Sequence, residues 1–387
     1  MSEWKECKLG DVLVFQRGHD LPKTEMVEGN YPVAGSNGII GFHSKYTTKG
    51  PGITIGRSGN IGTPHFYKNN FWAHNTVLYV KDFKGNSEIF LYYFLKTIDF
   101  KQFNTGSAVP SLNRNHIHEL LVEVPPLSEQ KSIASVLSSL DNKIDLLHRQ
   151  NTTLEKMAET LFRQWFVERC PEPVEGEEKE EWEIKKLGAI AEIQNGFAFS
   201  SKDYVEYADT HLEVFKMGHI QKGGGLRTDP KRDYVPRSER LKRWILNKGD
   251  IVMAMTDMKD NVVILGVPAM IDKDDNYVLN QRVARIYLKD KSNLISNYLL
   301  FIQLKDVDFI QELQSKANSG VQVNLSTESI KDSDIIIPPL AIQKEKSPII
   351  DDLYTKVELN QTQIRTLTAL RDTLLPKLMS GEVRVEE

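Results

Sequence analysis

The chain has 387 residues, 40% of them hydrophobic, and its 49 Lys and Arg against 53 Asp and Glu give a net charge of −4. This composition argues against wholesale disorder, and the longest apolar stretch, Val262–Ile271, is far too short to span a membrane. Two cysteines, Cys7 and Cys170, exclude a disulfide scaffold and predict free thiols in a reducing cytoplasm. The polar start, Met1–Glu6, predicts no signal peptide. Taken alone, the slight acidity argues against nucleic-acid binding.

Matching pieces of sequence recur in a fixed order, which predicts a duplicated unit. Trp4–Gly10 resembles Trp182–Gly188, and Gln16–Gly18 matches Gln194–Gly196 at the same spacing, which we call the first offset. Later matches lie farther apart, as where Gly249–Val252 matches Gly52–Ile55, so the second copy is the longer one. Asn104-Thr105-Gly106 resembles Asn318-Ser319-Gly320. A second, constant offset relates Pro125-Pro126-Leu127 and Gln130 to Pro338-Pro339-Leu340 and Gln343, and Leu140, Leu154 and Leu161 to Leu353, Leu367 and Leu374.

Each copy opens with a segment of mixed character, which predicts an α+β fold. Runs of β-branched and aromatic residues between Gly, Asn and Pro clusters predict strands at 52–56, 76–80 and 283–288. Helical spacing of apolar residues predicts helices at 88–103 and 294–313 that lie against a sheet.

Each copy closes with a leucine-periodic segment. In the first, apolar residues alternate at spacings of 4 and 3 from Ile133 to Trp165, with Asn151 the one polar member. This pattern is typical of a coiled-coil seam. With Ser128 as N-cap, a helix to about Arg169 would be roughly 60 Å long. The second seam runs from Ile350 to Leu378, is interrupted by Arg371, and could begin at Ser347-Pro348.

Two seams of matching length favour packing of the two helices against each other. The alternative is that each helix packs only on its own domain. Between the copies, residues 171–183 hold seven Glu and one Lys, which predicts an exposed linker.

No constellation of catalytic residues stands in the sequence. There is no phosphate-binding loop, no dinucleotide-binding glycine fingerprint and no amino-methyltransferase motif. Gly56–Asn60 lacks the second glycine of a nucleophile elbow and predicts a turn. His116 and His118 have no further ligand at metal spacing and predict a surface pair. Glu183-Ile184-Lys185 resembles the end of a nuclease signature but has no partner acid, so we interpret it as chance.

Two basic windows carry the electrostatic signal. Residues 29–81 contain five Lys and Arg, many aromatic residues and no Asp or Glu, and residues 222–248 have a balance of +6. Basic, aromatic loops on a folded platform suit phosphate and base contacts, although solvated loops are the alternative. The predicted DNA contacts are Lys45, Arg57, Asn60, Lys222, Arg227, Arg232, Arg237 and Arg243. Arg57 and Asn60 have the alternative role of shaping a turn.

The most specific motifs stand at the two helix ends, RDTLLPKLMSGE at Arg371–Glu382 and LFRQWF at Leu161–Phe166. The junction PPLSEQK at Pro125–Lys131, GRSG at Gly56–Gly59 and LNQR at Leu279–Arg282 accompany them. With these motifs the chain resembles, over essentially its full length, the specificity (S) subunit of type I restriction–modification systems. The second junction departs from the pattern, with Ala341-Ile342 in place of Ser-Glu, and leaves the start of that helix open.

The resemblance implies two target-recognition domains of mixed β-sheet and helices, separated by two long antiparallel coiled-coil helices. Each domain would read one half of a bipartite, asymmetric site on double-stranded DNA, and the paired helices would fix the spacing. Each half would recruit a methyltransferase (M) subunit that carries S-adenosylmethionine, and restriction (R) subunits would add ATP- and Mg-dependent cleavage. The chain itself would hold no cofactor and no metal. We expect partner contacts near Trp165, Phe166, Leu375 and Leu378.

The implied domains follow the repeat. They are recognition domain 1 (1–125), helical spacer 1 (126–170), the acidic linker (171–183), recognition domain 2 (184–338), helical spacer 2 (339–381) and a tail (382–387). Two other hypotheses stay open, a coiled-coil assembly scaffold and an enzyme, such as a fused methyltransferase or endonuclease, with unrecognised motifs. The net charge of −4 is weak evidence against DNA binding, because the linker alone contributes −6 and the rest of the chain is slightly basic.

Overall fold

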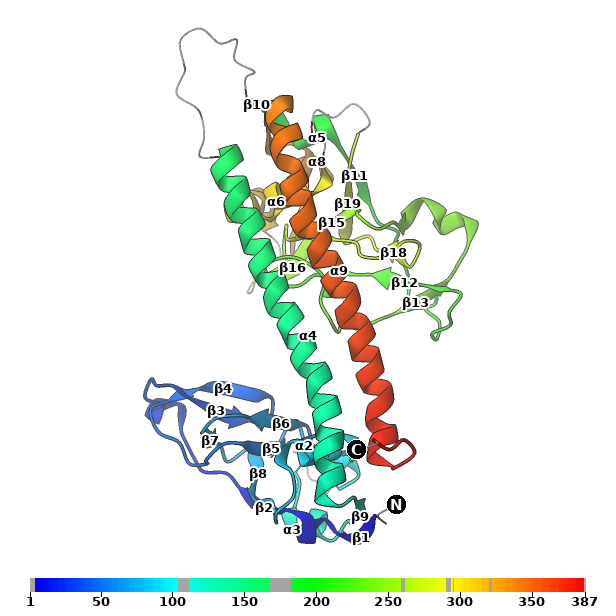
Figure 1. The fold of residues 1–387 in the computed structure, drawn as a ribbon. Coiled ribbons are helices and arrows are strands. Elements are labelled where there is room, and N and C mark those ends of the chain that lie inside the picture. Colours follow the sequence, from blue (N-terminus) through cyan, green and yellow to red (C-terminus); the bar gives the residue numbers. More distant parts are fainter. Residues whose placement is uncertain are drawn as a thin grey trace. The chain divides into compact units, whose positions relative to one another are not determined.

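The computed structural model describes residues 4–103, 111–167, 182–258, 262–289, 294, 296–319 and 322–385. The repeat piece Asn104–Gly106, Gly320, Cys170 and linker residues 171–181 lie outside them. The chain forms two compact units, of which unit 1 comprises Met1–His148 and Thr362–Glu387 and unit 2 comprises Arg149–Gln361. Each unit therefore combines one mixed domain with part of both long helices (Figure 1).

Unit 1 contains a four-stranded sheet in the order β2-β8-β5-β6, a three-stranded sheet β4-β3-β7, and the pair β1-β9. Its strands are β1 (Lys5–Lys8), β2 (Val14–Arg17), β3 (Tyr31–Gly35), β4 (Gly38–His43), β5 (Gly52–Gly56), β6 (Pro64–Tyr67), β7 (Trp72–Ala73), β8 (Val77–Asp82) and β9 (Leu121–Val124). Its short helices are α1 (Leu9–Val12), η1 (Lys23–Glu25), α2 (Glu88–Thr97), η2 (Phe100–Phe103) and α3 (Arg114–His118).

Unit 2 contains two four-stranded sheets, β11-β19-β15-β17 and β13-β12-β18-β14, a three-stranded sheet β16-β21-β20, and the pair β10-β22. Its strands are β10 (Glu183–Lys186), β11 (Ala191–Asn195), β12 (His211–Phe215), β13 (Tyr234–Pro236), β14 (Ile245–Leu246), β15 (Ile251–Ala254), β16 (Thr256–Met258), β17 (Pro268–Met270), β18 (Tyr277–Leu279), β19 (Val283–Leu288), β20 (Asn318–Ser319), β21 (Gln322–Asn324) and β22 (Asp334–Ile337). Its short helices are α5 (Leu187–Ile190), η4 (Met217–His219), η5 (Glu239–Trp244), α6 (Asn297–Lys305), α7 (Val307–Ser315) and α8 (Thr327–Lys331).

The predicted strands are confirmed as β5, β8 and β19, and the predicted helices are each divided in two. The first becomes α2 and η2, and the second becomes α6 and α7. The second division has a clear cause at Asp306, which ends α6 in an extended conformation and caps α7. Its carboxylate accepts from the Asp308 N–H at 2.9 Å, which fixes the start of the new helix.

The duplication is confirmed by strand pairing at the base of each unit. β1 pairs antiparallel with β9, and β10 pairs antiparallel with β22, so each domain is closed by its own first and last strands. The Leu9 N–H donates to the Leu120 carbonyl, and the Leu187 N–H donates to the Ser333 carbonyl, both at 2.8 Å. The first offset of the sequence repeat relates the two donors, and the second offset relates the two acceptors.

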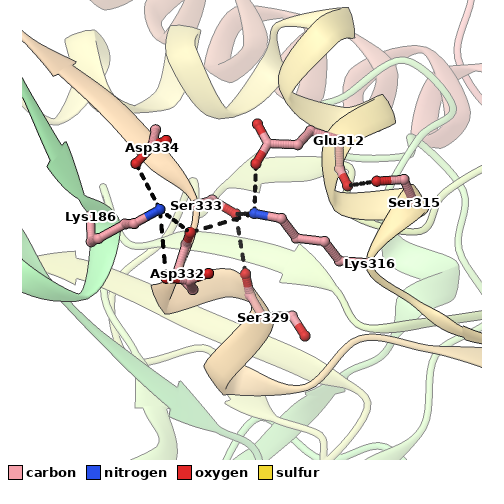
Figure 2. A network of polar contacts seen from close by, with 8 residues as sticks. All are labelled: Lys186, Glu312, Ser315, Lys316, Ser329, Asp332, Ser333 and Asp334. Atoms are coloured by element: carbon pink, nitrogen blue, oxygen red, sulfur yellow. Dashed lines mark hydrogen bonds and ion pairs between the residues drawn. The ribbon is translucent and has the colours of Figure 1, made fainter.

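An ion pair accompanies this closure in both units. Lys8 Nζ lies 2.5 Å from Glu119, and its repeat equivalent Lys186 lies 2.9 Å from Asp334 and 3.6 Å from Asp332. In unit 2 the contact continues into a network of lysine, serine and carboxylate groups, drawn in Figure 2. There Lys316 binds Glu312 at 2.6 Å, and the buried Ser333 donates to the Ser329 carbonyl at 3.1 Å.

The central strands align the repeat differently from the sequence prediction, which pairs Gly52 with Gly249. In the structure the Arg57 N–H donates to the Thr76 carbonyl, and the Met255 N–H donates to the Arg282 carbonyl. Arg57 is therefore equivalent to Met255, and the predicted alignment of β5 with β15 is wrong by one position. The error matters because a shift of one position exchanges the two faces of a strand.

The two leucine-periodic segments form the long helices α4 (Leu127–Phe162), extended by a π-helical turn at Arg163–Val167, and α9 (Leu340–Met379). The prediction of Ser128 as N-cap is wrong, because the Gln130 N–H already donates to the Pro126 carbonyl at 2.9 Å. The alternative start of the second helix at Ser347-Pro348 is also wrong, since α9 begins at Leu340 and continues through the proline.

Matching glutamines fix each long helix to the domain before it. The Gln130 side-chain amide donates to the Pro125 carbonyl at 2.9 Å, and the Gln343 amide donates to the Pro338 carbonyl at 2.7 Å. Both glutamines are buried, so each bond satisfies a carbonyl that water cannot reach. They are the two glutamines that the sequence repeat had paired.

α4 and α9 pack antiparallel within each unit. In unit 2, Asn151 pairs with Asn360, and Lys346 lies 5.4 Å over the Trp165 ring. In unit 1, Arg371 binds Asp141 at 2.7 Å, which explains the interruption of the second seam. The alternative that each helix packs only on its own domain is wrong, because Leu378 and Met379 of α9 lie in the core of unit 1. Among the described residues, no helix is both long and apolar enough to cross a membrane.

Candidate nucleic-acid interface

In unit 1, the predicted turn follows β5 directly. A Cβ at Gly56 would lie 1.8 Å from the Asn60 carbonyl oxygen, so the tight return of the chain requires glycine. The Arg57 N–H donates to the Thr76 carbonyl at 2.8 Å, and its Nε donates to the Asn75 carbonyl at 3.1 Å. Arg57 is half-buried and Asn60 is exposed. Arg57 therefore shapes the turn while its guanidinium lies at the edge of the sheet.

Further polar groups surround the Arg57 guanidinium. Burial lowers the pKa of Arg57, and the neighbouring Arg17 at the end of β2 lowers it further, while Asp20 raises it. Asp20 binds Arg17 at 3.5 Å and also accepts from the Asn75 side chain. The sequence prediction did not include Arg17 and Asn75, although the first lies in a repeated motif and the second in the acid-free window. With Arg57, these residues bring two guanidinium groups and one amide together: Arg17 at the end of β2, Arg57 directly after β5, and Asn75 in the loop before β8.

Lys45 lies on a different loop, between β4 and β5, and is exposed. The adjacent Tyr46 ring packs edge-on against Tyr31, with 5.1 Å between the ring centroids. On β4, Ile39 and Phe42 expose 55% and 53% of their surface. This combination of a lysine with exposed aliphatic and aromatic groups suits contacts to phosphates and to apolar base edges.

In unit 2, Lys222 and Arg227 lie on a hairpin loop between η4 and β13. Ile220 and Leu226 form an antiparallel bridge at its base, and Gly223–Gly225 all have positive φ angles. Glycine adopts this conformation without the steric cost of a Cβ, so the loop can turn tightly. Lys222 and Arg227 are exposed, and neither has an ion pair within the described residues. The loop presents two cations to solvent.

The next two predicted contacts are engaged with acids of their own unit. Arg232 Nε lies 3.4 Å from Glu213, which also binds His219 at 2.9 Å. Arg237 binds Asp275 at 2.7 Å and also donates to its backbone carbonyl. These ion pairs neutralise part of the charge that the sequence assigns to the basic window.

Two arginines of the same window lie on aromatic rings. Arg243 at the end of η5 lies 4.6 Å from the Trp244 ring centroid, and Arg240 lies 4.6 Å from that of Phe197. Arg240 also reaches Asp203 at 3.9 Å. The sequence prediction omits Arg240, and the structure places it beside the predicted Arg243. Both guanidinium groups are exposed, and their stacking holds them in defined positions.

The four predicted partner residues divide into two classes. Phe166 and Leu378 are buried in the cores of unit 2 and unit 1 respectively, so the structure gives both a packing role. Trp165 and Leu375 are partly buried at the edges of the same cores. The periodicity of the helix ends cannot separate buried from partly exposed residues, because the residues that bury Phe166 and Leu378 come from elsewhere in each unit.

The remaining candidate motifs have structural roles. The Nε2 atom of His118 accepts from the Phe15 N–H at 2.9 Å, so His118 is more than a surface residue, whereas His116 is exposed. Burial lowers the pKa of His118, which favours the neutral imidazole that this bond requires. Glu183 and Lys185 pair with each other on β10, and the described residues contain no group of three His, Cys, Asp or Glu that could hold a metal ion.

Comparison with known proteins agrees with the resemblance found in the sequence. Residues 1–156 and 179–369 match the family model of the type I restriction modification DNA specificity domain. Two of the similar proteins are specificity subunits from Methanocaldococcus jannaschii. The type I restriction enzyme MjaVIII specificity subunit is 24% identical over 409 residues, covering 100% of this chain and 94% of its own length. The MjaIX specificity subunit is 27% identical over 319 residues, covering 77% of this chain and 69% of its own length.

The fold has a solved counterpart in the type I restriction-modification S subunit of M. genitalium. The two structures superpose with a TM-score of 0.63 at 18% sequence identity, over 98% of this chain and 96% of the other. The family match covers most of the chain and falls on both copies of the repeat. The chain therefore belongs to the type I restriction modification DNA specificity family.

Proposed function

We propose that this chain is the DNA sequence-recognition subunit of a type I restriction–modification complex, in which each unit reads one half of a bipartite, asymmetric site. One observation carries the proposal: two copies of the same frame hold differently built basic loops. The frame repeats in its backbone hydrogen bonds, as at Arg57 and Met255. A shared frame would dock both units on DNA in the same manner, while different loops would select different bases.

The position of the extra residues supports this division. Gly18 and Arg57 of unit 1 are equivalent to Gly196 and Met255 of unit 2, and the interval between the second two is the longer. That longer interval contains the basic run from Lys222 onward. In unit 1 the corresponding interval carries β3, β4 and Lys45. Unequal loops at equivalent places favour two unequal half-sites over a palindrome.

For the long helices we propose two tasks, to set the spacing of the half-sites and to dock M subunits. The antiparallel packing in both units supports the first task. For the second, Trp165 and Leu375 are better candidates than the buried Phe166 and Leu378.

The chain would be non-catalytic and act in the cytoplasm, while M subunits would carry S-adenosylmethionine and any R subunits would carry ATP and Mg. Relatives named as specificity subunits support this role.

The test replaces both unpaired cations of the unit 2 loop, Lys222→Ala with Arg227→Ala, and measures DNA affinity of the chain with its M partner across a salt series. We expect affinity to fall about ten-fold and the slope of log affinity against log salt to decrease by up to about two, since each phosphate contact contributes about 0.9. The control, Lys186→Ala with Lys331→Ala, removes the same charge at β10 and α8, where both lysines already bind acids. An equal loss in the control, or affinity independent of salt, would favour a scaffold.

A second measurement separates recognition from catalysis. The pure chain is incubated with DNA and labelled S-adenosylmethionine, with and without the M subunit. We expect methyl transfer only when the M subunit is present. Transfer by the chain alone would contradict the proposal and support the enzyme hypothesis.

A further inference from the structure

Two asparagines meet in the apolar seam between α4 and α9 of unit 2. Asn360 donates its side-chain amide to the Asn151 side-chain carbonyl at 2.8 Å, and Asn151 donates to the Val357 carbonyl at 3.4 Å. Asn151 is 7% exposed and Asn360 is 1% exposed. A buried amide without a partner is costly, so each asparagine depends on the other helix.

A second polar contact joins the same helices in unit 1. Arg371 of α9 binds Asp141 of α4 at 2.7 Å, and Asp141 also accepts from the Tyr93 hydroxyl at 2.6 Å. Both charged side chains are mostly covered, with 23% and 29% of their surface exposed. This contact also requires one partner from each helix.

The internal repeat shows that neither polar pair has a polar counterpart. The second offset, which takes Leu140 to Leu353, relates Asn151 to Ile364 and Asn360 to Leu147, both buried in unit 1. The same offset relates Asp141 and Arg371 to Tyr354 and Ala158. Both of these are buried in unit 2. The two halves of the seam therefore share their apolar frame and differ in their polar pairs.

This asymmetry distinguishes correct from incorrect helix partners. Because α4 and α9 derive from one repeated segment, two copies of the chain can in principle pair α4 with α4. In that arrangement Asn151 would meet Leu147 of the second copy, and Asp141 would meet Ala158. Pairing α9 with α9 would place Asn360 against Ile364 in the same way. Every such pairing would leave the buried amides without their partners on the other helix. It would also separate Asp141 from Arg371, leaving Asp141 with Tyr93 and Arg371 with Asp372 of its own helix.

We infer that the two asymmetric polar pairs make α4 pair with α9 and reject the pairing of like helices from a second copy of this chain. Buried polar pairs that match only in one arrangement are a known means of selecting helix partners. The role is independent of DNA recognition, since it concerns only which helices form the seam. Pairing of α4 with α9 joins one unit 1 to one unit 2. Two unequal half-sites would require this combination, whereas pairing of like helices would join two copies of the same recognition domain.

The experiment uses the full chain and four versions of the seam. Asn151→Ile with Asn360→Leu makes both halves apolar, and Leu147→Asn with Ile364→Asn gives both halves an asparagine pair. Each of these makes the Asn positions symmetric. All four substitutions together move the pair from unit 2 to unit 1 and keep the asymmetry, so this variant is the matched control. Sedimentation equilibrium measures the dimer association constant, and circular dichroism with thermal unfolding measures folding.

We expect both symmetric variants to dimerise at least about ten-fold more strongly than the wild type, because an unpaired buried amide no longer opposes like-helix pairing. The moved-pair variant should match the wild type. Two outcomes overturn the inference: symmetric variants that fold but dimerise no more than the wild type, or a moved-pair variant that dimerises as they do. Since one symmetric variant adds amides and the other removes them, a folding defect in one leaves the other as the test.

Discussion

At the scale of single residues, glycines permit a close backbone approach at equivalent places in both units. A Cβ at Gly18 would lie 2.1 Å from the His74 carbonyl oxygen, and a Cβ at Gly196 would lie 2.1 Å from that of Asn280. Both glycines end the sequence motif that repeats at the first offset. The motif is thus a structural requirement of the frame, since these contacts hold the residue after β2 against the loop before β8, and the residue after β11 against the loop before β19.

Gly196→Ala should lower the free energy of unfolding of unit 2 by about 2 kcal/mol or more, because backbone atoms must move to admit the methyl group. The matched control is Gly218→Ala in η4, where a Cβ would meet nothing within 4 Å. There we expect a change within about 0.5 kcal/mol. Denaturant unfolding of the two variants measures the difference. Equal effects would show that the close approach at Gly196 is tolerated.

At the scale of elements, α9 continues through a proline that the sequence marks as a helix start. Pro348 has no N–H to donate to the carbonyl of Lys344, and it lies exposed in the interior of the helix. The helix nevertheless begins at Leu340, because Gln343 and Ile350 are buried on either side of the proline. Packing of these neighbours outweighs the local preference, as tertiary context commonly does.

Pro348→Ala should therefore stabilise the chain by about 1–3 kcal/mol, since it restores a helical hydrogen bond and removes a steric conflict without loss of buried surface. Lys344→Ala, at another exposed position of α9, is the control and should change stability by less than about 0.5 kcal/mol. Thermal and denaturant unfolding of both variants gives the comparison. A destabilised Pro348→Ala would mean that the proline is needed where it stands.

At the scale of the whole molecule, the two units share a frame and differ in their loops, so each should have its own share of the DNA sequence preference. Arg57 belongs to unit 1, where its Nε bond to the Asn75 carbonyl fixes the direction of the guanidinium. Arg227 belongs to the unit 2 loop. Changes at these two places should therefore affect different half-sites.

Arg57→Ala should relax base preference in one half-site, with a loss of about 1–3 kcal/mol of discrimination, and leave the other half-site unchanged. Lys81→Ala, which removes a cation from the same acid-free window on β8, is the control and should leave both preferences intact. Binding to DNA libraries randomised in each half, with the M partner present, measures both. Loss of preference in both halves would contradict independent recognition by the two units.

Features that depend on local pattern could be predicted from the chain alone. Repeated motifs revealed the duplication, heptad spacing revealed two long helices, and the distribution of charge revealed two basic windows within an acidic chain. Such patterns are visible because helix period and local charge are properties of neighbouring residues. The α+β class and the family followed from the same information.

The folded structure was needed for every feature that depends on residues far apart in the chain. It shifted the strand alignment by one position, carried α9 through Pro348, and placed Phe166 and Leu378 in the cores. It also paired Arg371 with Asp141 and Asn151 with Asn360, which the sequence showed only as interruptions of apolar seams. Burial and polar pairing arise when distant segments meet, and a single sequence records the two partners without recording that they meet.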